Sequence, residues 1–518
     1  MHRTTNRRIA CVGLLLSLLF FSANCVCQNP ANNQDSALSA AKKALTQGEL
    51  DQAEQQLWKV LSSNPDQAEA LNLLGLIRGQ QKRYPEAEAL FRRVLQLDPK
   101  AVETHRNLAN ALLIQNKTIE AIDEYTILTK LAPDDTQLRI QLAHLYLMSG
   151  KFTEALSALD QVKANRFPVD AVPLKAAALL GLGKTKEAAL LIPIAVKSPN
   201  TAADLAEVFL EGGAPEYALK VIEGVQNGAQ PMSARLLYLR GRALAGAGNQ
   251  TAALASLQQS LTRAPKSVDT LLALASAYSS QAEHDKSMEL LQRANALEPD
   301  SPRVLRPLVI EGMKTGNHAA ALSAAHALAA KSPDSPDDQY VAAAAMLEAK
   351  DDVTAEQIFE KYVQARSNDA KAFLGLGVAQ LSQRKYPEAR KALERALEID
   401  PNLADAEYEL AMVAEQQGAT DEAFQRLERA VQLQPQHAMA LASLGAHYLQ
   451  TGDLNKARGF LERSVAVNPN NFKSQYDFGL VLAKLGRNDE AHQHLERSQV
   501  LRNAEDLGKS PRSGSVHP

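Results

Sequence analysis

The sequence has 518 residues, and its hydrophobic fraction of 45% is typical of folded proteins, which excludes a chain that is disordered throughout. Its 56 basic and 59 acidic side chains give a net charge of -3, and this balance argues against nucleic acid as the main partner because phosphate neutralisation needs a basic excess. Aromatic residues make up only 5%, and alanine and leucine carry the apolar content instead, which favours closely packed helices and argues against a sheet-based enzyme.

The first 27 residues have the order of a secretory signal peptide. Arginines at positions 3, 7 and 8 precede an apolar stretch over 9–21, and small residues follow at Ser22 and Ala23. The apolar stretch is shorter than the about 20 residues that a spanning helix needs, and no later stretch approaches that length. We therefore predict that residues 1–27 direct export and are removed, which leaves no membrane span, with an uncleaved anchor as the alternative.

All three cysteines, Cys11, Cys25 and Cys27, lie in this leader. The rest of the chain therefore has no disulfide, no thiolate metal ligand and no catalytic thiol. A cysteine near the cleavage point leaves a lipid anchor as an alternative, although Asn24 and Val26 are poor residues to precede a lipidated cysteine.

A repeat of 34 residues follows the leader. Prolines mark its end in three series, and an alanine follows 22 residues after nearly every proline position, with Ser287 as the exception. This register defines about 14 repeats. The proline positions are Pro65, Pro99 and Pro133, then Pro231, Pro265, Pro299 and Pro333, then Ser367 in place of proline, and finally Pro401, Pro435 and Pro469.

Each repeat has the pattern of two helices joined by a turn. Leu441, Leu444 and Tyr448 recur at helical spacing and form one apolar stripe. Gly452 is predicted to end this helix, and Asp453 is predicted to cap the next one. Small residues in the first helices are expected to face the recurring alanines of the second helices, so that the two backbones lie close together.

These features resemble the tetratricopeptide repeat family, over residues 34–502. The resemblance rests on the helix–turn–helix unit with small residues at Gly75 and Ala87, an aromatic residue at Phe91 and a proline at Pro99. It implies an all-α fold, a right-handed superhelical solenoid of about 14 helix–turn–helix units with first helices lining its concave groove. It also implies a scaffold that binds protein or peptide partners rather than an enzyme.

The pattern divides the chain into segments. Residues 34–167 hold repeats 1–4 and residues 234–502 hold repeats 7–14, each in a nearly constant register. Between them, 168–233 contains several prolines and irregular repeat lengths, so we predict two degenerate repeats, with a linker as the alternative. Residues 503–518 lack an apolar pattern and are predicted to be disordered.

The sequence contains no convincing motif for chemistry. Gly183, Lys184 and Thr185 resemble the end of a phosphate-binding loop, but the glycine required five residues earlier is Ala178. His492 and His494 point to different sides of a helix and cannot share a metal as an i,i+4 pair can. We therefore predict no catalytic residue, no metal and no cofactor.

Together with the leader, the repeats resemble an exported bacterial member of the family. The expected function is non-enzymatic scaffolding in cell-envelope assembly, such as polysaccharide export or pilus biogenesis. The periplasm is the expected location, with secretion or an outer-membrane lipoprotein as alternatives. Alternative functions are an accessory subunit of an envelope enzyme complex, or an enzyme with a site built in the groove.

The groove is predicted from first-helix residues that lie off the apolar stripe. Asn107 matches an asparagine with which related superhelices hold a peptide backbone, and Asn110 lies beside it. Charged residues are expected to make a basic segment followed by an acidic one. The basic candidates are Arg235, Arg242, Arg303, Arg306 and Lys314, and the acidic candidates are Asp337, Glu348, Asp405, Glu409 and Glu415.

Overall fold

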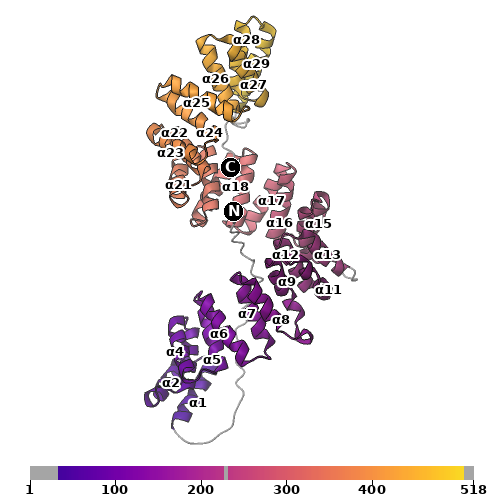
Figure 1. The fold of residues 1–518 in the computed structure, drawn as a ribbon, viewed down its shortest axis with the longest axis vertical. Coiled ribbons are helices and arrows are strands. Elements are labelled where there is room, and N and C mark those ends of the chain that lie inside the picture. Colours follow the sequence, from indigo (N-terminus) through magenta and orange to yellow (C-terminus); the bar gives the residue numbers. More distant parts are fainter. Residues whose placement is uncertain (1–32, 227–230, 507–518) are drawn as a thin grey trace. The chain divides into compact units, whose positions relative to one another are not determined.

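A computed structural model describes residues 33–226 and 231–506 (Figure 1). Within these ranges it contains 29 α-helices and two short 3₁₀ helices, and no strand. None of these helices is both long enough and apolar enough to cross a membrane. The chain divides into two compact halves at residues 263 and 264, called here the N-terminal and C-terminal halves. The predicted signal peptide lies outside the described residues.

Five regular helix pairs build most of the N-terminal half. Each pair is one repeat, and neighbouring pairs contact one another along the chain. The pairs are α1 (Asn33–Thr46) and α2 (Leu50–Ser63), α3 (Ala68–Gln80) and α4 (Tyr84–Leu97), α5 (Val102–Ile114) and α6 (Thr118–Leu131), α7 (Thr136–Met148) and α8 (Phe152–Asp160), and α14 (Ala234–Gly246) and α15 (Gln250–Arg263).

The irregular segment between α8 and α14 is also helical. It contains η1 (Ala164–Arg166), η2 (Val169–Ala171), α9 (Val172–Gly181), α10 (Thr185–Ala189), α11 (Ile192–Ala195), α12 (Pro199–Glu211) and α13 (Pro215–Gln226). Pro193 stands at the start of α11, where a missing N–H is tolerated, and the second helix of this repeat is therefore split into α10 and α11. One apolar core joins α9 to α14 and fully buries Phe209 and Ile222, so the segment is packed rather than extended like a linker.

Seven helix pairs build the C-terminal half. They are α16 (Val268–Ser280) and α17 (His284–Leu297), α18 (Pro302–Lys314) and α19 (His318–Lys331), α20 (Pro336–Glu348) and α21 (Asp352–Ala365), α22 (Ala370–Ser382) and α23 (Tyr386–Ile399), α24 (Ala404–Gln416) and α25 (Thr420–Leu433), α26 (Ala438–Thr451) and α27 (Leu454–Val467), and α28 (Phe472–Lys484) and α29 (Asn488–Asp506). The last helix continues to Asp506, so residues 503–506 are helical and the predicted disordered tail begins too early. Residues 507–518 lie outside the described part.

Local sequence signals set the ends of these helices. Asp369 accepts hydrogen bonds from the backbone N–H groups of Lys371 and Ala372 at the start of α22, which satisfies donors that a helix leaves free. Gly452 adopts the left-handed conformation with φ 87°, and Asp453 caps α27, as the sequence predicts. The all-α repeat fold predicted from the periodicity is therefore confirmed.

Small residues let the two helices of a repeat approach closely, but most of them do not face the recurring alanines as the sequence predicts. A side chain on Gly445 would meet Leu461 at 2.5 Å, and one on Gly75 would meet Phe91 at 2.5 Å. The contact residue is thus the large residue four positions after the recurring alanine. Gly312 is different because a Cβ there would lie 2.9 Å from the Cβ of the recurring alanine itself, Ala321.

Gly312→Ala is expected to destabilise the C-terminal half by about 1–2 kcal/mol, because the added Cβ would lie 3.0 Å from the backbone nitrogen of Ala321, which cannot rotate away. Gly459→Ala in α27 is the matched control, because nothing lies within 4 Å of its added Cβ. The control is expected to gain about 0.5–1 kcal/mol from lower backbone entropy. Urea unfolding followed by circular dichroism measures both changes, and a stabilised Gly312→Ala protein would disprove the close approach.

Candidate partner-binding surface

One row of side chains on each first helix faces away from the second helices. In α24 the buried Ala411 and Ala414 pack toward α25, and the buried Leu410 packs toward α22 and α23. The opposite side of the helix carries Asp405, Tyr408, Glu409, Met412 and Glu415, which follow helical spacing. We call this row, and its equivalents on the other first helices, the groove row.

Amide side chains on the groove row of the N-terminal half are linked to their neighbours. Asn72 on α3 accepts hydrogen bonds from Thr104 at 3.3 Å and from Asn107 at 3.4 Å, both on α5. Asn110 accepts a hydrogen bond from the hydroxyl of Tyr125 at 3.4 Å. The structure therefore places the two predicted asparagines in separate hydrogen-bonded groups, and their role in binding stays a prediction.

Three of the predicted basic residues form ion pairs between repeats. Arg235 on α14 lies 2.7 Å from both Asp204 and Glu207 on α12. Because Asp204 and Glu207 are both negatively charged, they compensate the positive charge of Arg235, which is therefore not free to attract a binding partner.

The same compensation recurs in α18 of the C-terminal half. Arg303 lies 2.6 Å from both Asp269 and Glu298, and Arg306 lies 2.5 Å from Asp338. Of the remaining predicted basic residues, Arg242 lies over the ring of Tyr238, and Lys314 donates a hydrogen bond to Ser279 at 3.2 Å. The positive charges counted in the sequence thus hold repeats together, and their role in binding stays a prediction.

The predicted acidic residues fall into two groups. Asp337 pairs with Arg366 at 3.1 Å, Asp405 lies 3.0 Å from the imidazole of His437, and Glu348 is half-buried at the end of α20. Glu409 and Glu415 make no hydrogen bond or ion pair with any described residue.

Glu409 and Glu415 are only weakly compensated by nearby positive charges. Burial, together with the nearby Asp405, raises the pKa of Glu409 to about 7. Burial likewise raises the pKa of Glu415 above its ordinary value, although Lys473 and His447 oppose the shift. These carboxyls are therefore exceptions to the general pairing of charges on the first helices.

Several groove-row residues are missing from the sequence prediction. Asp477 and Tyr476 occupy on α28 the positions that Glu409 and Tyr408 occupy on α24, two repeats earlier. The 34-residue register that located the alanines would have located them too. The charged residues of the sequence prediction lie on α14, α18, α20 and α24, so the prediction does not include α28.

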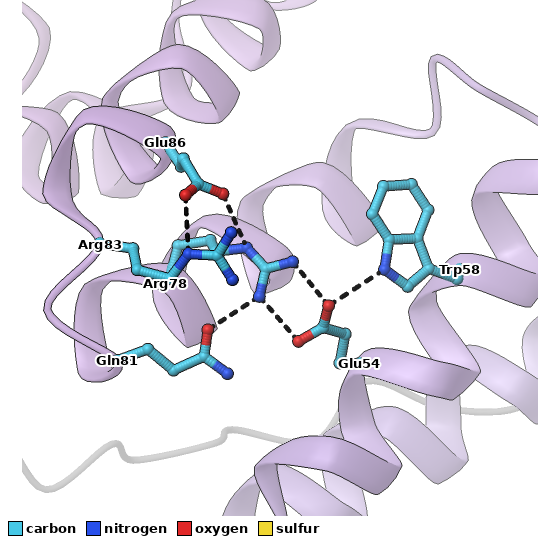
Figure 2. Close-up of polar contacts among 6 residues, drawn as sticks. All are labelled: Glu54, Trp58, Arg78, Gln81, Arg83 and Glu86. Carbon is cyan, nitrogen blue, oxygen red and sulfur yellow. Dashed lines mark hydrogen bonds and ion pairs between the residues drawn. The ribbon is translucent and has the colours of Figure 1, made fainter.

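A second class of polar contact joins some repeats to the next, and Figure 2 shows one example. Arg78 on α3 is only 7% exposed and makes a two-pronged contact with Glu54 on α2, at 2.6 and 2.7 Å. The indole N–H of Trp58 donates to the same carboxylate at 3.2 Å, and Arg78 donates to Gln81 at 2.8 Å. The hydrogen bond from Arg78 lowers the pKa of Glu54 to about 2.

The contact recurs at the residue directly after the recurring alanine, and we call it the polar junction. Glu88 accepts from Gln115 at 3.0 Å and from Lys117 at 2.8 Å in the next repeat. Glu356 accepts from Gln383 at 2.8 Å and from Lys385 at 2.5 Å.

One polar junction has the opposite polarity. There the arginine Arg390 takes the position of the glutamate, and it donates to Gln417 at 2.9 Å and to Glu422 at 2.5 Å. Charged groups with several partners each thus fix how neighbouring repeats pack at these sites.

The polar junction at Glu54 predicts acid sensitivity. The folded pKa of about 2 lies below the unfolded value of about 4.3, so the carboxylate contributes stability above the unfolded value and loses it as pH falls toward 2. The Glu54→Gln protein is therefore expected to be less stable than the parent at neutral pH, with the gap narrowing below about pH 4. Urea unfolding midpoints of the parent and the Glu54→Gln protein, measured from neutral pH to about pH 2, test this prediction. A stability difference that does not narrow below about pH 4 would contradict the ion pair of Glu54 with Arg78.

An open pocket of about 550 Å³ lies at the loop before α22, where Ser367 replaces the recurring proline. Its charged groups have structural partners: Asp369 caps α22, and Arg366 pairs with Asp337. Among the described residues, no group of three histidine, cysteine or acidic side chains is placed to hold a metal ion. The groove row is therefore the leading candidate for a partner-binding surface.

Family models described as tetratricopeptide repeat match residues 38–102, 78–136, 203–268, 366–404 and 374–438, and a second such model matches 244–306 and 414–477. Together they cover more than half of the chain. The chain belongs to the tetratricopeptide repeat family, as the sequence predicts. Its repeats are those of a protein-interaction scaffold.

Individual relatives match over part of their length. Superkiller complex protein 3 of Mus musculus is 26% identical over 258 residues, which are 50% of this chain and 15% of that protein. Cellulose synthase operon protein C of Escherichia coli (strain K12) is 24% identical over 291 residues, 52% of this chain and 24% of that protein. The chain thus spans a quarter or less of these relatives. The solved Cut9-Hcn1 hetero-tetramer covers 87% of this chain and 97% of its own, with 14% identity and a TM-score of 0.37.

Proposed function

We propose that this protein is an exported, non-enzymatic scaffold that binds protein or peptide partners along the groove row. The observation that carries the proposal is the groove row itself. On successive first helices it carries polar, charged and apolar side chains that stay half-buried or exposed, such as Asn107, Met412 and Tyr476. A folded repeat array that leaves one face of many helices open suits the binding of an extended or helical partner segment.

The proposed setting is assembly in the cell envelope, in the periplasm. Two observations support it. The leader has the charge, apolar and small-residue order of an export signal. The likeness to cellulose synthase operon protein C connects the repeats to a protein named for a polysaccharide synthase operon.

A second candidate is an accessory subunit of an envelope enzyme complex. The same likeness favours it, because that relative is named for an operon that contains an enzyme. The two candidates differ in their partner: an accessory subunit copurifies with an enzyme in fixed ratio, whereas an assembly scaffold captures structural proteins.

The test is affinity capture from an envelope extract with residues 28–518 as bait. The groove variant carries Asn107→Ala, Arg242→Glu and Met412→Glu, and the control carries Lys130→Ala, Arg263→Glu and Gln425→Glu at exposed second-helix positions. We expect the parent and the control to capture the same proteins and the groove variant to lose them.

Capture of the same proteins by the groove variant would refute binding along the groove row. The location is tested separately by fractionating cells that produce the full chain or a chain without residues 1–27. Appearance of the full chain in the cytoplasm alone would refute export.

A further inference from the structure

The groove row of the last three repeats has a distinct character, mixed from acidic, aromatic and apolar side chains. We call the row over α24, α26 and α28 the acidic face. Its residues are not the buried ones of these helices, and Tyr476 is 48% exposed. The face is made of Tyr408, Glu409, Met412, Glu415, Tyr476 and Asp477.

Three observations link the helices that carry this face. The ring of Tyr408 on α24 lies 5.2 Å from the ring of His437, which caps α26. Helices α26 and α28 contact one another directly. Lys473 on α28 acts electrostatically on both Glu415 of α24 and Asp477 of its own helix.

The three carboxyls of this face differ from the other carboxyls of the first helices. Glu409, Glu415 and Asp477 form no hydrogen bond or ion pair with any residue that the structure describes. Burial raises the pKa of each, whereas a partner arginine lowers the pKa of Glu54 at its polar junction. Glu409 and Asp477 are half-buried and have no ion-pair partner among the described residues, so a cation that arrives with a ligand stabilises their charged forms.

We propose that the acidic face binds an extended segment of a partner protein in which arginine or lysine residues are interspersed with apolar residues. The inference rests on the proposed function and names the chemistry of the partner for one part of the groove. Lys350 and Lys473 act on these carboxyls without forming an ion pair with them, so charge complementarity still selects a cation. The tyrosine rings and Met412 accept the apolar side chains, and a guanidinium can also stack on a tyrosine ring.

The repeat spacing predicts how far apart the basic residues stand. Glu409 and Asp477 occupy equivalent positions two repeats apart. Packed helices lie about 10 Å apart, so these carboxyls are separated by about 20 Å. An extended segment crosses that distance in about six residues. Two basic residues about six positions apart can therefore reach both carboxyls.

The test uses the full mature chain and three fluorescent peptides of alternating leucine and serine that carry two arginines, two glutamines or two glutamates six positions apart. The variant Glu409→Gln/Asp477→Asn removes charge with little change of shape. The control Glu428→Gln/Glu462→Gln removes two exposed charges from second helices of the same repeats. Fluorescence anisotropy gives the affinities, and melting curves confirm that both variants are folded.

We expect the parent and the control to bind the arginine peptide, and the variant to bind it about tenfold more weakly. The glutamine peptide should bind the parent about as weakly as the arginine peptide binds the variant. Equal binding of the arginine peptide by parent and variant, tighter binding of the glutamate peptide, or no binding of any peptide by the parent would overturn the inference. If capture by the parent still depends on the groove row in that case, the proposed function stands and only this partner chemistry falls.

Discussion

Arg78→Ala is expected to destabilise the first repeats by about 3 kcal/mol. The guanidinium is 7% exposed and joins α2 to α3 through Glu54 at 2.6 and 2.7 Å (Figure 2). Its removal leaves the Glu54 carboxylate, which is 23% exposed, without a cation and with only neutral donors such as the indole N–H of Trp58. Urea unfolding, with hydrogen exchange followed over α2 and α3, measures the loss.

Arg83→Ala is the matched control for this prediction. Arg83 also pairs with a glutamate, Glu86 at 2.7 Å, but its side chain is 49% exposed, so its loss should cost less than about 1 kcal/mol. The double variant Glu54→Ala/Arg78→Ala should cost less than the two single variants added together, because neither charge is then left alone. Additive losses would show that the pair does not act as a unit.

Ala457→Leu is expected to cost about 3 kcal/mol, the upper end for overpacking, because no space is left at this recurring alanine. Ala457 is fully buried and packs in one cluster with Leu461, Phe478 and Leu482, which come from α27 and α28. A leucine there must displace the following repeat or adopt a strained rotamer. Thermal unfolding of the parent and the variant measures the cost.

Ala483→Leu on α28 is the control, since this alanine is exposed. It adds the same atoms to a neighbouring helix with no packed neighbour to displace, and its stability should stay within about 0.5 kcal/mol of the parent. If Ala457→Leu and the parent unfold at the same temperature, the assignment of the recurring alanines to the helix–helix contact is wrong.

The sequence alone predicted the helices well because their determinants are local and periodic. Apolar spacing, Gly452 and Asp453 set one helix end and the next helix start without reference to distant residues. The same reasoning placed the groove row, because the face of a helix follows from counting residues. It extended the tail prediction over 503–506, where α29 continues without a strong apolar pattern.

Pairing of charges could not be predicted in the same way. The sequence predicts Arg303 in a basic segment, yet it pairs with Asp269 in the preceding repeat and Glu298 in the loop before its own helix. Partners that are 34 and 5 residues away depend on how two helices pack and on which rotamers they allow. Counting charges on one helix therefore overestimates the charge that a groove presents to a ligand.

The reversed polar junction also bears on how the gene can change. Repeats of equal length invite recombination that deletes one unit and joins its neighbours in register. Loss of α22 and α23 would bring Glu356 against Gln417 and Ala419 in place of Gln383 and Lys385, so its carboxylate would lose the cation that pairs with it. Because α24 and α25 receive an arginine rather than a glutamate from the preceding repeat, the order of these repeats matters for folding.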